Sequence, residues 1–234
     1  MQHCLYLRCY KQEQLIFKHH AAFVLMKTPA FYLLLLLLCP LFTFAQTFKA
    51  GIAGGVNFTQ IDGDNIGGYN KFGANVGFLS EIPFSDRWAV GLELLYTQKG
   101  SRAVVTANNL SNFKINMDYA EIPVLVKYHD KKGGFNFGGG FALGRLVRTR
   151  YIEDGTDATE AYFNGANKPK RWEWSIIADV SYMITPVWGI SLRGAYSLLP
   201  VRQDPNSLFR NSGQFHNVLS VRTIFMFSAI NKKD

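Results

Sequence analysis

Few residues of this chain could take part in chemistry. Most of them are charged residues within stretches where apolar and polar side chains alternate. Past residue 45 there are two histidines, His129 and His216, and no cysteine. A catalytic serine needs its base within about 3 Å, and four residues of strand place Ser220 about 13 Å from His216. That pair fails, although Ser197 stays open as a cross-strand partner. We interpret His216 as a polar rim histidine and predict that the protein is not an enzyme.

Metal and cofactor sites are equally hard to find. Without cysteine in this part of the chain, disulfides and thiolate-bound metals are excluded there. Asp62–Asn65 resembles the start of a calcium loop, but Ile66 occupies the third ligand position and Gly73 stands where the bidentate glutamate belongs. The sequence therefore predicts no metal site and no cofactor.

The more informative charges share one face of alternating segments, whose other face is apolar. In a narrow closed sheet they could not all stay hydrated, so we expect them to pair with each other and to plug the interior. This predicted interior charge network consists of Lys49, Glu81, Glu93, Glu121, Lys127, Asp179, Arg193 and Arg222.

The elements that must position these charges are strands. In Trp88–Gly100, apolar and aromatic side chains alternate with small, polar or charged ones, as on the two faces of a β-strand. A membrane-spanning strand needs about 9–11 residues, an apolar outward face and aromatic ends. Seven other stretches resemble this one: 48–59, 72–84, 119–128, 135–151, 172–184, 188–197 and 215–228.

The connections between these stretches alternate between long and short, which is typical of an up-and-down outer-membrane barrel. The rival is a soluble eight-stranded barrel with its apolar side chains inside. About forty bulky apolar side chains would not fit such an interior, so Phe78, Leu92, Leu94 and Ile176 should face lipid. The predicted fold is all-β: an eight-stranded antiparallel transmembrane β-barrel. Aromatic residues predicted to form its interfacial belts are Trp88, Tyr96, Tyr128, Phe135, Trp172, Trp188 and Phe215.

The first 45 of the 234 residues differ from the rest. Lys27, the run Leu33–Leu38 and the small residues Thr43 and Ala45 indicate a cleavable signal peptide, with the cut between Ala45 and Gln46. The alternative, a helical membrane anchor, would need about 20 apolar residues. We therefore assign residues 1–25 to a non-native upstream extension, 26–45 to the signal peptide and 46–234 to the barrel.

Removal of the first 45 residues leaves a mildly basic chain. They contain four of the 25 Lys and Arg and one of the 17 Asp and Glu, so the net charge falls from +8 to +5. With no nucleic-acid motif in an exported chain, we predict no nucleic acid partner.

Several short motifs together resemble the PorT-like outer-membrane β-barrel family across essentially all of the mature chain. They are Gly55–Thr59 with Asp62–Asp64, Glu81–Arg87 leading to Leu94–Gly100, and Tyr119–Pro123 with Lys127–Tyr128. The resemblance implies an integral outer-membrane barrel, often described as porin-family, with no catalytic residues to carry over. The family's namesake belongs to a protein secretion system, a role that the fold alone does not transfer. One departure is the seven residues that follow Phe227, where such barrels often end on an aromatic residue.

These observations predict a location and two classes of function. We expect an outer-membrane protein of a Gram-negative bacterium with both termini in the periplasm. It would act as a structural or interaction barrel, as in a secretion system or the envelope, or alternatively as a narrow porin-like channel for small solutes or ions. Expected partners are outer-membrane lipid, lipopolysaccharide, the β-barrel assembly machinery and an envelope protein.

Basic residues in or beside the long connections form a second group. We predict that some bind anionic lipid phosphates, although ordinary solvated loop charge, offset by Glu153, Asp154, Asp157, Glu160 and Asp204, explains them equally well. The group consists of Lys99, Arg102, Lys114, Arg150, Lys168, Lys170, Arg171, Arg202 and Arg210.

Two local predictions concern pairing. If Thr185–Val187 is a three-residue turn, opposed residues of the flanking strands sum to 372, which sets Asp179 directly against Arg193 inside the barrel. Pro123 cannot donate a ladder hydrogen bond, so we expect a local bulge or bend there.

Overall fold

The structure, a computed structural model, describes residues 48–64, 66–104, 112–130, 132–165, 168–203 and 213–227. The chain divides into two units, Met1–Ala45 and Gln46–Asp234, and all described residues belong to the second. The upstream extension, the signal peptide and its cleavage site at Ala45 and Gln46 therefore lie outside the described residues and stay predictions.

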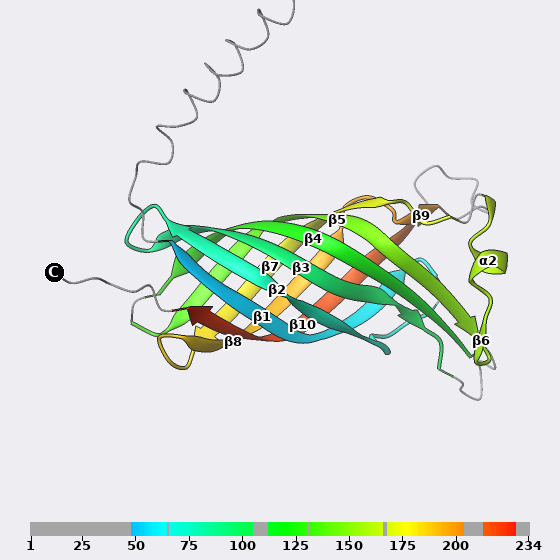
Figure 1. The fold of residues 1–234 in the computed structure, drawn as a ribbon, viewed down its shortest axis with the longest axis horizontal. Coiled ribbons are helices and arrows are strands. Elements are labelled where there is room, and N and C mark those ends of the chain that lie inside the picture. The colour runs from blue at the N-terminus through cyan, green and yellow to red at the C-terminus, as the bar shows by residue number, and fades with distance from the viewer. Residues whose placement is uncertain are drawn as a thin grey trace, which may run out of the picture. The chain divides into compact units, whose positions relative to one another are not determined.

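Eight long antiparallel strands close into a barrel, as predicted (Figure 1). Each strand pairs with its neighbours, and the last long strand pairs with the first, so the described sheet closes on itself. The strands are β1 (Lys49–Asp62), β2 (Lys71–Pro83), β3 (Trp88–Arg102), β4 (Phe113–His129), β5 (Phe135–Glu153), β7 (Trp172–Met183), β8 (Trp188–Ser197) and β10 (Gly213–Phe227).

Three short elements lie in the long connections. They are β6 (Thr156–Asp157), helix α2 (Thr159–Tyr162) and β9 (Arg202–Gln203). None of the helices among the described residues has the length and hydropathy needed to cross a membrane.

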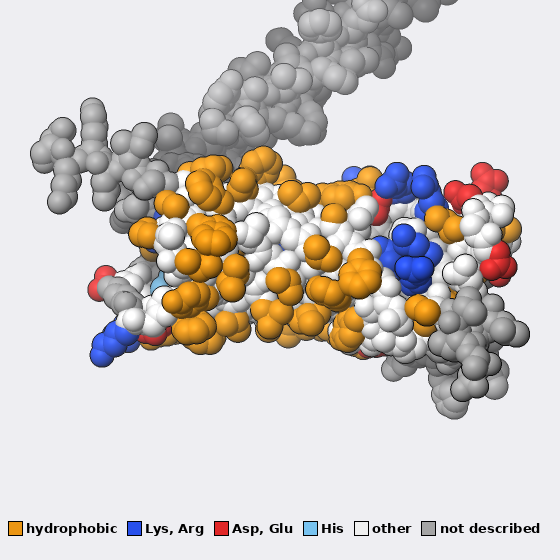
Figure 2. All heavy atoms as spheres, turned by 90° about the horizontal axis from the view of Figure 1, so that it is seen from below, with side chains coloured by type: hydrophobic (Ala, Val, Ile, Leu, Met, Phe, Trp, Pro, Cys, Tyr) orange, Lys and Arg blue, Asp and Glu red, His pale blue; other side chains and the backbone are white. Residues whose placement is uncertain are grey.

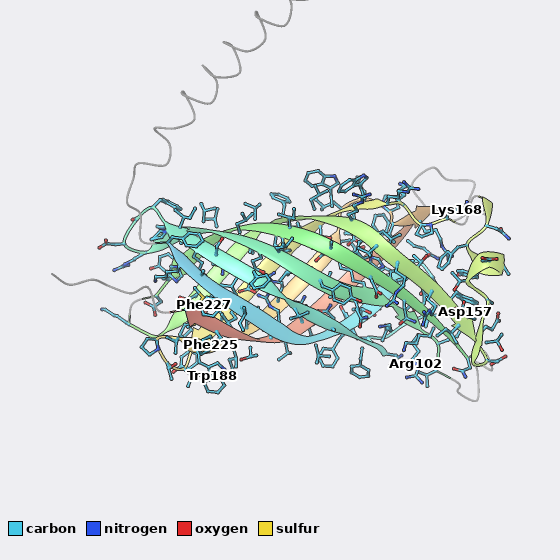
Figure 3. The ribbon with its side chains drawn as sticks, viewed as in Figure 1. Arg102, Asp157, Lys168, Trp188, Phe225 and Phe227 are labelled. Atoms are coloured by element: carbon cyan, nitrogen blue, oxygen red, sulfur yellow. The ribbon has the colours of Figure 1, made fainter. Side chains whose placement is uncertain are left out.

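The two ends of the barrel differ. At one, here called the turn end, short turns join β2 to β3, β4 to β5 and β7 to β8, and β1 begins where β10 ends. Figure 3 labels Trp188, Phe225 and Phe227 there. The other, the loop end, carries the long connections, with Arg102 and Asp157 labelled beside them.

Alternation along the strands separates a lipid-facing wall from the lumen. The predicted outward residues Phe78, Leu92, Leu94 and Ile176 are 65%, 49%, 56% and 46% exposed, and Figure 2 shows hydrophobic side chains over much of the wall. Their inward neighbours are buried and largely polar or charged. This arrangement excludes the soluble barrel with an apolar interior, since its bulky side chains would point the other way.

The strand registers refine the two local predictions. Between β7 and β8, Asp179 pairs with Arg193 and Val180 with Leu192, which confirms the predicted register. Of the bulge or bend expected at Pro123, the bulge is absent: β4 keeps its register there, and only its pairing with β3 is interrupted, at Ile122 and Pro123. The irregularity lies instead opposite Asp118 and Tyr119, where Val147 of β5 is left unpaired.

Candidate functional site

The structure brings most of the predicted interior charge network together in the lumen. Seven of its eight members are at most 8% exposed: Glu81, Glu93, Glu121, Lys127, Asp179, Arg193 and Arg222. Lys49 is exposed, contrary to prediction, because it is the first residue of β1, and with Glu81 it lines a cavity at the turn end.

Six of these charges form what we call the central network, with three anions and three cations. Glu93 accepts two hydrogen bonds from Arg193, at 2.7 and 2.8 Å, and one from Arg222 at 3.1 Å. Asp179 accepts from Arg193 Nε at 3.0 Å and from Arg222 Nη2 at 2.8 Å. The predicted Asp179–Arg193 pair is thereby confirmed, within a larger cluster than expected.

Lys127 completes the central network on the side of the turn end. Its Nζ lies 2.6 Å from Glu81 and 3.9 Å from Glu93. Each member comes from a different strand, and β5 contributes Gly138, whose missing side chain leaves room for Lys127 and Asp179. The charges balance, so burial does not leave an uncompensated ion.

A second network lies nearer the loop end. Lys99 Nζ contacts Glu121 and lies 2.8 Å from Glu173, whose other carboxylate oxygen lies 2.9 Å from His216 Nδ1. Ser175 also donates to Glu173, at 2.9 Å.

The two networks are related by the strand repeat. β3, β4, β7 and β10 each supply one residue to both, six positions apart: Glu93 and Lys99, Lys127 and Glu121, Asp179 and Glu173, Arg222 and His216. Six residues span about 20 Å of strand, so the two charged layers occupy separate levels of the lumen.

Sequence reasoning misplaced two members of the second network. Lys99 was predicted to lie at the outer rim, yet it is 2% exposed inside the barrel. His216 is fully buried rather than at the rim. Both errors came from making the strand too short at the loop end, since β3 continues to Arg102 and β10 already begins at Gly213. The signal that could have found them is their even spacing from Glu93 and Arg222 on the inner face.

Apolar layers close the lumen beyond the charges. At the loop end, inward side chains of β1, β4 and β5 pack with Phe163, which follows α2; this outer cluster is Ile61, Ile115, Met117, Tyr119, Tyr151 and Phe163. Tyr162 of α2 stacks on Tyr151 with ring centres 3.8 Å apart. A turn-end cluster contains Ala53, Leu79, Ile224 and Met226.

A cavity of about 430 Å³ lies at the turn end of the lumen. Its lining includes Lys49, Glu81, His129 and Met183, and also turn residues such as Pro186. It therefore opens toward the turns, and Glu81 of the central network and Ile224 and Met226 of the turn-end cluster form part of its wall.

The hydrogen bonds of the candidate catalytic residues are structural. Ser220 donates to Asn57 at 2.7 Å, and Ser197 accepts from the backbone N–H of His216, not from its ring. In the described part of the chain, no group of three or more His, Cys, Asp or Glu residues could hold a metal ion.

Comparison with family models matches residues 44–203 to the outer membrane protein beta-barrel domain. This span covers more than half of the chain and includes most of the described strands. The search of curated proteins found no match.

Solved structures of several outer-membrane proteins are similar to the chain. Ail, the attachment invasion locus protein of Yersinia pestis, is 12% identical over 77% of this chain and 99% of its own, with a TM-score of 0.44. The Neisserial surface protein A is 13% identical over 77% and 97%, with a TM-score of 0.42. OprG from Pseudomonas aeruginosa is 15% identical over 78% and 95%, with a TM-score of 0.37. Because the identities and TM-scores are this low, no residue's role is transferred from these proteins to this chain.

Proposed function

Because the chain belongs to the outer membrane protein beta-barrel domain family, we propose that it is a non-enzymatic structural or interaction barrel of the outer membrane with a sealed lumen. The observation that carries this proposal is the filling of the lumen by two charged networks and two apolar clusters. An ion would have to displace buried, mutually paired charges in order to pass.

A sealed barrel acts through what it displays at its ends. We propose that the loop end faces the outside and that both termini lie in the periplasm, as is usual for even-stranded outer-membrane barrels. β1 begins and β10 ends at the turn end, beside the short turns, which supports this orientation. An epitope inserted between β3 and β4 should then be labelled on intact cells, whereas one at the C-terminus should be labelled only after permeabilisation.

The partner of such a barrel is a further part of the proposal. The resemblance of the sequence motifs to the PorT-like family supports an envelope or secretion-system role for a barrel of this type. We also propose that the assembly machinery inserts the barrel, because outward-facing Phe225 and Phe227 close the last strand.

Planar-bilayer conductance separates the scaffold from the alternative, a narrow channel. We expect the purified protein to insert without steady ion-sized conductance, while a general porin in the same bilayers conducts. The cavity at the turn end is the one described feature that favours a channel, as its entrance. Reproducible conductance steps from the purified protein would replace the scaffold with the channel.

A further inference from the structure

Basic side chains gather on the outer wall of the barrel at the loop end. They project from β3, β4, β5 and the connection that leads to β7, and Figure 2 shows a group of Lys and Arg side chains beside the hydrophobic band. We call this the basic surface; it comprises Arg102, Lys114, Arg145, Arg148, Arg150, Lys168, Lys170 and Arg171.

The strand register fixes the level of this surface relative to lipid. Tyr96, Ala120, Arg145 and Trp172 occupy one cross-strand row on the outer wall, and the Arg145 guanidinium lies 5.7 Å from the Trp172 ring. Aromatic side chains in such a row mark the boundary between hydrocarbon and headgroups. Arg145 therefore lies at headgroup depth.

Rows on either side of Arg145 differ in chemistry. Toward the turn end, the next row contains Ile122, Leu143 and Trp174, all outward. Toward the loop end, successive rows contain Arg148, then Arg150, and then Arg102 opposite Lys114. A ligand that covers this wall must be apolar at one end and anionic at the other.

The cations of the basic surface outnumber the acidic partners they have among the described residues. Arg148 pairs with Asp118 at 2.7 Å, and Arg150 lies 3.7 Å from Asp157. Hydrogen bonds from Thr159 lower the pKa of Asp157 and keep it ionised. The other six cations form no ion pair with a described carboxylate.

Two of these six cations oppose each other directly. Arg102 pairs with Lys114 across β3 and β4, and like charges at directly opposed positions destabilise a sheet. An anion bound between the two side chains would remove that repulsion. A phosphomonoester suits this position, because it carries up to two negative charges and several acceptor oxygens.

We propose that the basic surface binds the phosphates of a lipid A-type glycolipid while the apolar rows below contact its acyl chains. This inference rests on the proposed orientation, which puts the loop end in the outer leaflet. A polysaccharide or nucleic acid would leave the adjoining Ile122, Leu143 and Trp174 uncovered, whereas a phosphorylated glycolipid matches both halves of the surface.

The test measures binding of hexa-acylated, bisphosphorylated lipid A to the detergent-purified protein by microscale thermophoresis. The variant replaces Arg102, Lys114 and Arg171 with glutamine, because none of the three forms an ion pair with a described carboxylate. The matched control replaces Lys49, Arg87 and Lys132, three exposed cations at the turn end, in the same way. Each cation near an anionic lipid surface contributes about fivefold in affinity, so the first variant should bind about a hundredfold more weakly and the control within twofold of the original.

Binding measurements with two other lipids identify the ligand chemistry. Dephosphorylated lipid A should bind the original protein as weakly as bisphosphorylated lipid A binds the variant, and phosphatidylglycerol should bind more weakly than lipid A. Equal loss in both triple variants, unchanged affinity in the loop-end variant, or equal affinity for phosphatidylglycerol would overturn the inference. A heat-induced shift in gel mobility checks that every variant is folded. The scaffold proposal is tested separately, since conductance does not depend on lipid A binding.

Discussion

At the scale of single residues, the central network is organised around Arg193. This guanidinium bridges Asp179 of the neighbouring strand β7 and Glu93 of β3, which lies on the opposite side of the barrel from β8. Pairing across the lumen in this way couples strands that share no backbone hydrogen bonds. The charged side chains therefore connect distant strands across the lumen as well as filling it.

Replacement of Arg193 by methionine should destabilise the barrel by about 3–5 kcal/mol, because it leaves buried carboxylates without their main partner. The double variant Arg193→Met with Asp179→Asn restores charge balance and should be more stable than the single one. Urea unfolding in lipid vesicles measures both. If the single variant were the more stable of the two, the carboxylate of Asp179 would not depend on Arg193.

Lys99 allows a matched comparison between the lumen and the outer wall. Lys99→Met should cost about 3–5 kcal/mol, since Glu121 and Glu173 lose their shared cation. Arg102→Gln, three residues further along β3 but exposed, should change stability by less than about 0.5 kcal/mol. The same unfolding assay applies, and equal effects from both substitutions would contradict the burial of Lys99.

Sequence alone predicted the face of each interior charge better than the length of each strand. Side chains alternate between the two faces of a strand, so Glu93 and Arg193 belong to the lumen wherever the strand ends lie. A one-residue slip would turn every apolar side chain inward. Lys49, Lys99 and His216 depended on where β1, β3 and β10 begin or end. Strand ends follow from loop packing, which no local pattern encodes.

At the scale of elements, β5 illustrates the same limit. The strand was expected to end near Tyr151 and extends to Glu153, and an unpaired Val147 shifts its pairing with β4. This shift keeps Arg148 and Arg150 outward after Arg145. Neither Arg145 nor Arg148 was among the basic residues predicted to meet lipid, because that group was drawn from residues in or beside the long connections. For Arg148, strict alternation also does not anticipate the extra residue.

Outward positions on β3 should tolerate charge according to their depth in the bilayer. Leu94→Arg should destabilise the barrel by about 2–4 kcal/mol, whereas Val104→Arg, beyond the end of the strand, should cost about 0–1 kcal/mol. Unfolding in vesicles of defined lipid measures the difference. Equal costs at Leu94 and Val104 would place the two side chains at the same depth.

At the scale of the whole barrel, the layers of the lumen form an ordered series. From the turn end they are the cavity, a level shared by the turn-end cluster and the central network, the second network and the outer cluster. Buried Leu125 and Ile177 lie between the two charged networks on β4 and β7, so apolar side chains separate the charged layers. In the proposed scaffold, such a filled lumen leaves the two ends of the barrel as the surfaces that meet partners.

Thiol accessibility tests the sealed lumen most directly, since the predicted mature chain has no cysteine of its own. Met183→Cys, which lines the turn-end cavity, should react readily with a cationic, water-soluble methanethiosulfonate. Ser220→Cys, at a 2% exposed position between the two charged networks, should stay unlabelled until the protein is unfolded. Labelling of folded Ser220→Cys as fast as Met183→Cys would show that water and ions reach the middle of the barrel, and would contradict the sealed scaffold.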